Sequence, residues 1–235
     1  MHEYYAKRQK KYLKKMRSEL GVVSSEIEQA FHKSYFEILR EAEEIYINNF
    51  LEDMPYIGGN KSMNNQDLTD ACFYAALYEV GKKYGVSVET VGKIANDAKE
   101  KLFEKIPSFF RGLVPKIFNT KLGQYLLRKF SDKSKECAGY EYSWLFDYEE
   151  PDEIYSHKIR AIRCGTCKYF RDKNIVELLP YICNLDYVIW GKMGLPMYRE
   201  NALGYGDDSC TMYIKRNEKI PDTWPPHGLR RDGLK

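Results

Sequence analysis

The sequence predicts an α+β fold, with a long helical region followed by a small antiparallel β-sheet that carries an inserted helix. Up to about Ser134, apolar residues recur every three or four positions, as they do along one face of a helix. After Cys137 they alternate with other residues at a period of two, which is typical of strands. We expect a single domain of 235 residues, with a helical part at about 1–134, an α+β part at about 135–216 and an irregular tail at 217–235.

The regular elements follow from these two periods and from the turn residues between them. Helices are expected at 5–21, 25–54, 68–78, 87–105 and 109–126, with Pro115 as the point where the last one kinks or divides. Strands are expected at 140–148, 155–163, 198–203 and 210–215, and the inserted helix at about 176–191.

Composition restricts the partners and the compartment. The 37 basic and 34 acidic residues leave a net charge of only +3, so we expect neither a nucleic acid nor a membrane as a partner. The N-terminus lacks the apolar segment of a secretory signal, and the chain lacks a run of about 18 apolar residues. We therefore expect a cytoplasmic protein with reduced thiols, and its oligomeric state stays open, with a homo-oligomer among the alternatives.

Four of the six cysteines gather in the last third of the chain, at Cys164, Cys167, Cys183 and Cys210. Such thiols can be core residues, nucleophiles or metal ligands. As a set they would suit zinc or iron, but zinc sites usually present two close pairs, and here the second pair is split by a helix and a hairpin. No cofactor is predicted, and a metal bound by these four thiols remains an alternative.

Carboxylates accompany these thiols. Asp186 follows Cys183 by three residues and so shares its face of the predicted helix, where it could act as a general base. Asp207 and Asp208 lie in a glycine-rich turn just before Cys210. Aspartates in turns often hydrogen-bond to the backbone, so a structural role is the alternative for this pair.

Three ordered segments resemble one protein family. They are Arg163-Cys164-Gly-Thr-Cys167, Leu179-Pro-Tyr-Ile-Cys183-Asn-Leu-Asp186-Tyr187 and Gly206-Asp207-Asp208-Ser-Cys210-Thr-Met-Tyr213. Together they are similar to motifs of the L-2-amino-thiazoline-4-carboxylic acid hydrolase family, over about a quarter of the chain. The closing hairpin is also similar to that of 4-vinyl reductase domains, which hold a small ligand between helices and an antiparallel sheet.

The resemblance implies a hydrolase that opens a small cyclic amidine such as 2-aminothiazoline-4-carboxylate to a carbamoyl amino acid. It implies Asp186 as the base, supported by Asp207 or Asp208, and Cys164, Cys183 or Cys210 as nucleophile, acid or ligand. Arg163 and Arg160 would bind the substrate carboxylate, with Tyr187 beside the substrate. The alternative is a non-catalytic domain that binds a small ligand or a metal for sensing or assembly.

Overall fold

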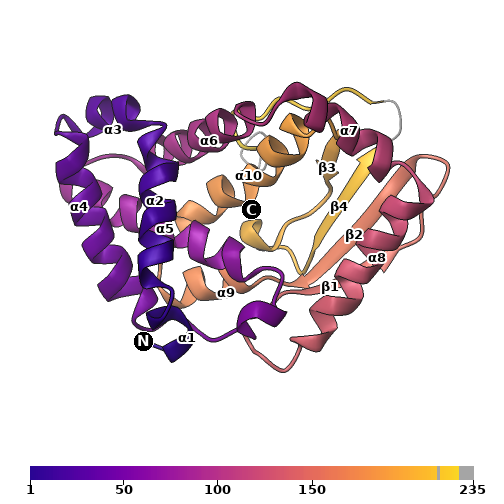
Figure 1. Cartoon of the computed structure of the whole chain (residues 1–235), viewed down its shortest axis with the longest axis horizontal. Coiled ribbons are helices and arrows are strands. Elements are labelled where there is room, and N and C mark those ends of the chain that lie inside the picture. The colour runs from indigo at the N-terminus through magenta and orange to yellow at the C-terminus, as the bar shows by residue number, and fades with distance from the viewer. Residues whose placement is uncertain (216–217, 228–235) are drawn as a thin grey trace.

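A computed structural model of the chain describes residues 1–215 and 218–227. Helices form one half of the molecule, and a four-stranded antiparallel sheet with its covering helices forms the other (Figure 1). The predicted α+β fold class is confirmed. Of the tail predicted at 217–235, residues 218–227 contain no α-helix or strand, and residues 217 and 228–235 lie outside the described part.

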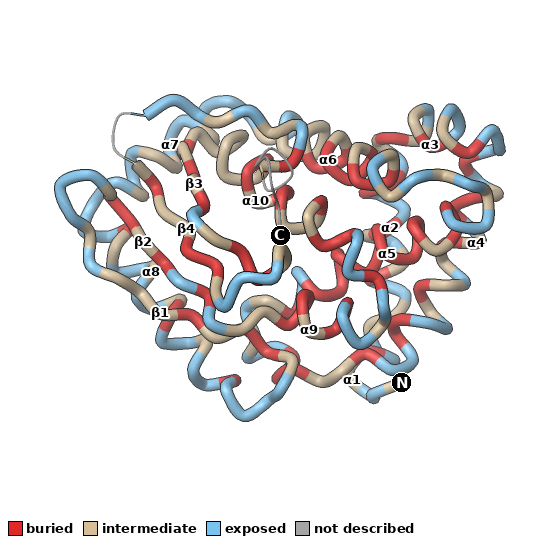
Figure 2. The backbone as a smooth tube through the Cα atoms, turned by 180° about the vertical axis from the view of Figure 1, so that it is seen from behind, coloured by how far each residue is buried: buried red, intermediate tan, exposed pale blue. Residues whose placement is uncertain are grey.

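Eight α-helices occupy the described chain up to Glu136. They are α1 (Glu3–Ala6), α2 (Gln9–Gly21), α3 (Ser24–Phe31), α4 (Tyr35–Ile45), α5 (Asn65–Tyr84), α6 (Val88–Glu104), α7 (Ser108–Phe118) and α8 (Lys121–Glu136). A π-helical turn at Tyr46–Leu51 extends α4, and a 3-10 turn lies at Gly59–Lys61. Helix α5 is the centre of the helical half, because it is buried on nearly every side (Figure 2).

Two predicted helices are each divided in two. The helix expected at 25–54 is interrupted at His32, whose left-handed φ of 51° ends α3 before α4 begins. The helix expected at 109–126 breaks between α7 and α8, and Pro115 lies within α7 rather than at the break. The two helices meet closely at Gly123, where a Cβ atom would lie 2.0 Å from the carbonyl oxygen of Phe118.

The sheet contains β1 (Leu145–Glu149), β2 (Tyr155–Arg163), β3 (Met197–Arg199) and β4 (Cys210–Lys215) in the order β1-β2-β4-β3. Every neighbouring pair is antiparallel. In the central pair, Ala161 lies opposite Cys210, and Ile159 lies opposite Met212. This register brings the end of β2 and the start of β4 together at one end of the sheet.

Two strands are shorter than predicted. The strand expected from Tyr140 begins only at Leu145, because residues before it form a turn in which the Ser143 hydroxyl lies 2.6 Å from the carbonyl oxygen of Cys137. The strand expected at 198–203 covers Met197–Arg199, and the chain then enters a 3-10 turn at Leu203–Tyr205.

Two helices, rather than one, connect β2 to β3. Helix α10 (Leu179–Lys192) corresponds to the predicted helix, with Pro180 in its first turn. Helix α9 (Gly165–Asp172) was not predicted, although Cys164 acts as its N-cap and accepts a hydrogen bond from the backbone N–H of Cys167 (3.5 Å). The Cys-x-x-Cys segment is therefore the first turn of a helix.

The two halves of the molecule are joined by the packing of α10 against α6. This contact depends on Gly92 in α6, where a Cβ atom would lie 2.2 Å from Cδ1 and 2.8 Å from Cβ of Tyr181. An added methyl group would have to displace the base of the Tyr181 side chain and not only its tip.

We predict that Gly92→Ala lowers the free energy of unfolding by about 1–3 kcal/mol, because overpacking at α6 and α10 outweighs the better helix propensity of alanine. The matched control is Gly112→Ala in α7, where a Cβ atom meets no atom within 4 Å. That variant should be as stable as the parent or slightly more so. Chemical denaturation measures both, and a Gly92→Ala protein of unchanged stability would contradict the packing described here.

Candidate active site

A cavity of about 420 Å³ lies against one face of the sheet, with α5, α8, α9 and α10 around it. Alternate residues of β2 and β4 line it, because side chains two positions apart point to the same face of a strand. These strand residues are His157, Ile159, Ala161, Cys210, Met212 and Ile214. Several of the predicted site residues are among the residues that line this cavity.

All four clustered thiols line this cavity, and all are free. Cys183 projects from α10 toward the turn after β3, where a Cβ atom on Gly204 would lie 2.5 Å from its sulfur. Cys210 accepts a hydrogen bond from the backbone N–H of Leu203 (3.0 Å). The structure thus gathers the thiols that the sequence singled out.

The thiols differ in acidity. Hydrogen bonds with Cys164 and Cys183 raise the pKa of Cys167, which therefore keeps its proton. The hydrogen bond from Cys167 lowers the pKa of Cys183, and the charge of Arg199 adds to this against the opposing effect of burial. Burial raises the pKa of Cys210 to about 12. Cys183 is thus the thiol most suited to act as a thiolate nucleophile.

Asp186 lines the cavity together with the thiols, and its partner is Arg199 in β3. The Arg199 side chain is only 4% exposed, and its guanidinium also donates to the carbonyl oxygen of Cys183 (2.8 Å) and to the sulfur of Met212 (3.3 Å). Sequence reasoning missed Arg199 because no motif contains it. Its signal was a lone arginine within a predicted strand.

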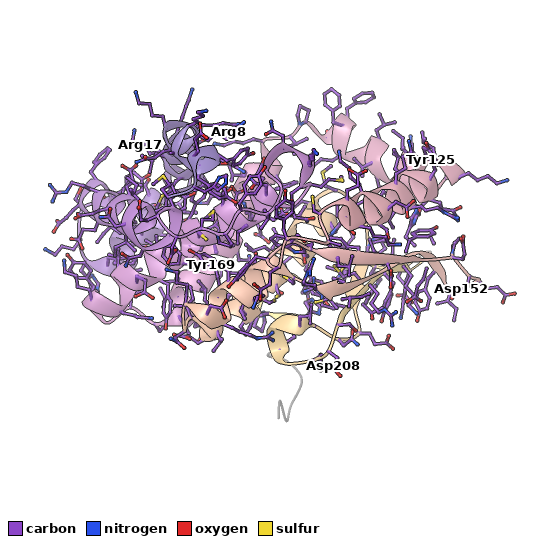
Figure 3. The ribbon with its side chains drawn as sticks, turned by 90° about the horizontal axis from the view of Figure 1, so that it is seen from below. Arg8, Arg17, Tyr125, Asp152, Tyr169 and Asp208 are labelled. Atoms are coloured by element: carbon purple, nitrogen blue, oxygen red, sulfur yellow. The ribbon has the colours of Figure 1, made fainter. Side chains whose placement is uncertain are left out.

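The other predicted aspartates lie outside the cavity lining. Asp207 accepts a hydrogen bond from the backbone N–H of Ala202 (2.8 Å) and so closes the turn before β4. Asp208 is exposed and projects from the surface of the molecule (Figure 3). The geometry of Asp207 corresponds to the structural alternative left open by the sequence.

The predicted substrate-binding residues also lie outside the lining. Arg163 holds the turn before β1, donating to the carbonyl oxygens of Ser143 (2.9 Å) and Ala138 (2.8 Å). Arg160 forms an ion pair with Asp147 of the neighbouring strand (3.6 Å). Tyr187 is buried on α10 with its ring stacked on that of His227, 3.8 Å between centroids.

Helix α5 adds a carboxylate that the sequence analysis did not nominate. Asp67 is accessible from the cavity and accepts a hydrogen bond from the side-chain amide of Asn64 (2.7 Å). Desolvation by the protein atoms around it raises the pKa of Asp67 to about 6, with further contributions from the charges of Asp186 and Asp70, although the residue as a whole is exposed. A carboxyl group with such a pKa can give or take a proton near neutral pH.

A buried ionic network lies beside Asp67. Lys99 of α6 pairs with Glu19 (2.5 Å) and lies 3.9 Å from Asp70, which also pairs with Lys15. Tyr74 donates a hydrogen bond to Glu19. The spacing of Asp67 and Asp70 places both on one face of a helix, but this spacing alone does not distinguish a site residue from a solvent-facing one.

Metal binding finds no geometric support in the part of the chain that the structure describes. Among residues 1–215 and 218–227, no three His, Cys, Asp or Glu side chains are placed to hold an ion together. Within the same residues, no helix is long and apolar enough to cross a membrane.

We predict that Cys183 is the fastest thiol to react with iodoacetamide, because its pKa is lowered whereas the pKa values of Cys167 and Cys210 are raised. Cys167→Ala removes the hydrogen bond that lowers this pKa, so the pH midpoint of labelling should move upward. If the acid dissociation constant of Cys183 falls tenfold, labelling at pH values below both midpoints slows about tenfold. Mass spectrometry of the labelled protein identifies the site.

The matched control is Cys137→Ala, which removes a buried thiol outside the cavity lining and should leave the midpoint unchanged. Faster labelling of Cys164 or Cys210 than of Cys183 would overturn the assignment, as would an unchanged midpoint in Cys167→Ala.

Comparison with known proteins adds one positive finding. A family model described as L-2-amino-thiazoline-4-carboxylic acid hydrolase matches residues 63–214, about two thirds of the chain. No curated protein and no solved structure matches the chain, so the likeness of the closing hairpin to 4-vinyl reductase domains stays a prediction. The matched region runs from the start of α5 to β4 and includes Asp67, Asp186 and all four clustered thiols. The chain belongs to the L-2-amino-thiazoline-4-carboxylic acid hydrolase family.

Proposed function

We propose that the protein hydrolyses a cyclic amidine, with 2-aminothiazoline-4-carboxylate as the simplest substrate. Water would add at the ring carbon between nitrogen and sulfur, and cleavage of the C–S bond would give N-carbamoyl-cysteine. One observation carries the proposal, which is that a thiol with a lowered pKa, Cys183, lines the same cavity as two carboxylates, Asp67 and Asp186. Family membership supports the same class of reaction.

The first step opens the ring. The Cys183 thiolate attacks the amidinium carbon and forms a new C–S bond. The C–S bond of the ring then breaks, and its sulfur takes a proton from the carboxylic acid of Asp67. The substrate is left as an amidinium attached to Cys183, and Asp67 is left as a carboxylate.

The second step releases the product. Water attacks the same carbon, and the Asp67 carboxylate takes one of its protons. The bond to Cys183 breaks, which restores the thiolate, and loss of a proton to solvent leaves the carbamoyl group. The net reaction consumes one water and releases one proton for each protonated substrate molecule.

The remaining polar groups would bind the substrate. Asp186, oriented by Arg199, can accept a hydrogen bond from the amidinium nitrogen. Besides Arg199, the cations that border the cavity are Lys99 and Lys158. Lys158 lies on the face of β2 opposite to Ile159 and pairs with Glu149 (2.9 Å), so Lys99 is the one proposed for the substrate carboxylate. Asp186 is therefore proposed as a binding residue, and the proton-transfer role expected of it passes to Asp67.

A non-catalytic ligand-binding domain is the second candidate, because most side chains that line the cavity are apolar. Turnover separates the two candidates. A binding domain would take up a cyclic amidine without releasing a thiol, whereas the hydrolase releases one thiol for each ring opened.

We predict that Asp67→Asn lowers kcat/KM for 2-aminothiazoline-4-carboxylate by about 10²- to 10⁴-fold, because asparagine cannot transfer the proton. Cys183→Ser should lower it at least as much, because the weaker serine nucleophile lacks an activating base. Release of the product thiol, measured with a chromogenic disulfide, follows the reaction. Asp208→Asn, on the exposed turn, is the matched control and should keep the parent rate.

The pH profile gives a separate check on Asp67. Ring opening needs the protonated acid, so loss of the Asp67 proton above about pH 6, the pKa of Asp67, should reduce the rise in kcat/KM that ionisation of Cys183 produces as pH increases. The residual activity of Asp67→Asn should lack this limit and follow the ionisation of Cys183 alone above pH 6. Full turnover by either Asp67→Asn or Cys183→Ser would exclude the mechanism.

A further inference from the structure

We propose that the physiological substrate carries an extended apolar group, which occupies the end of the cavity remote from the thiols. This inference rests on the proposed function and deepens it, because it specifies the class of cyclic amidine. The relevant region, here called the apolar end, is formed by Phe118, His157, Trp190, Met197 and Ile214.

The size of the cavity is the first argument. A volume of 420 Å³ corresponds to roughly 14 water molecules at about 30 Å³ each. It falls within the range of roughly 300–1,000 Å³ that is usual for drug-sized ligands. A single five-membered ring with an amino group and a carboxylate would leave most of this space unfilled.

The thiols and the apolar end lie at different positions along the same two strands. At one end of the cavity Ala161 of β2 lies opposite Cys210 of β4, beside the other thiols. Four residues along β2, His157 lies opposite Ile214. At about 3.3 Å per residue, the two positions are roughly 13 Å apart. The reacting groups therefore occupy one end of a cavity that continues well beyond them.

Side chains from several elements pack together to form the apolar end. The Phe118 ring contacts His157 with centroids 4.2 Å apart and Trp190 with centroids 5.3 Å apart. Met197 and Ile214 belong to a small apolar cluster separate from the main core. Five different elements (α7, α10, β2, β3 and β4) thus converge on a region that the small ring does not need.

The test compares 2-aminothiazoline-4-carboxylate with a derivative that carries a hexyl chain on the ring. Binding is measured by calorimetry and turnover by thiol release. We expect the hexyl derivative to bind at least about tenfold more tightly, because its chain leaves water for an apolar surface. Ile214→Trp, which fills the apolar end, should abolish this preference, whereas Ile162→Trp on the exposed face of β2 should preserve it.

The outcomes separate this inference from the proposed function. Equal affinity for the two compounds would contradict the proposal that the apolar end binds part of the substrate. A preference that survives in Ile214→Trp would contradict it as well. Should Ile214→Trp not fold, Met197→Phe tests the same space with a smaller change. A preference without turnover of either compound supports the apolar end and overturns the hydrolase.

A different surface carries a second inference independently of the cavity. The outer face of α7 and α8 exposes seven large apolar side chains, and no residue of α7 is fully buried. They are Phe109, Phe110, Leu113, Ile117, Leu122, Tyr125 and Leu126. Tyr125 marks this face at the edge of the molecule (Figure 3). Apolar patches of this extent usually have a partner.

Charge indicates which partner. Residues 105–131 contain six lysines and arginines and no acidic residue, although the whole chain has a net charge of only +3. A second copy seated on this face would bring like charges together, and a nucleic acid would leave the aliphatic side chains uncovered. We infer that the α7–α8 face docks on the surface of an anionic lipid bilayer without crossing it. This revises the expectation, drawn from total charge, that a membrane is not a partner.

Co-sedimentation of the full chain with vesicles tests this inference. We expect binding to phosphatidylcholine vesicles that contain phosphatidylserine and little binding to phosphatidylcholine alone. Lys121→Ala combined with Lys129→Ala should weaken binding roughly tenfold or more, and Leu122→Glu should do the same. Phe36→Glu, at an exposed aromatic residue of α4, is the control and should bind as the parent does. Binding to RNA but not to vesicles, or dimerisation through this face with no vesicle binding, would refute the inference.

Discussion

The buried guanidinium of Arg199 is the interaction on which the site depends. A charged side chain that is 4% exposed costs several kcal/mol unless it is paired and hydrogen-bonded. Arg199 meets this requirement with two groups from one turn of α10, the carboxylate of Asp186 and the carbonyl oxygen of Cys183. Strand β3 has only three residues, all paired with β4. The contacts of Arg199 therefore give this short strand a second attachment, to α10. The same charge lowers the pKa of the Cys183 thiol.

The closing hairpin then brings the backbone against the thiols. Asp207 fastens its turn by accepting from the N–H of Ala202, and Leu203 donates to the sulfur of Cys210. Gly204 follows, and its missing Cβ leaves room for the sulfur of Cys183. The Gly-Asp-Asp-x-Cys segment resembles a catalytic motif in sequence, yet Asp207 holds the turn and Asp208 is exposed at the surface. The segment and the turn before it contribute a backbone that lies close to the sulfur atoms of Cys183 and Cys210, and they contribute the buried thiol of Cys210 itself.

Much of the fold could be predicted from period and turn residues, and the errors have physical causes. The helix break at His32 lacks glycine or proline, and α9 is too short for periodicity to reveal. Arg160 could have been excluded earlier, because it points to the opposite face from Ile159 and Ala161. Arg163 could not have been excluded from the sequence, because the direction of its side chain follows from a shift in register between Leu145 and Phe146 of β1.

Asp67 could not be recognised without the tertiary structure, because a polar residue near the start of a helix usually faces water. Helix α5 is central, so its two aspartates face the ionic network (Asp70) and the cavity (Asp67). Cations pair with Asp70, Glu19 and Asp186, and such pairs commit carboxylate oxygens to fixed partners. Asp67 instead accepts from the neutral amide of Asn64 and remains accessible from the cavity. A carboxyl group in that position can exchange a proton with a ligand without breaking an ion pair that holds the fold together.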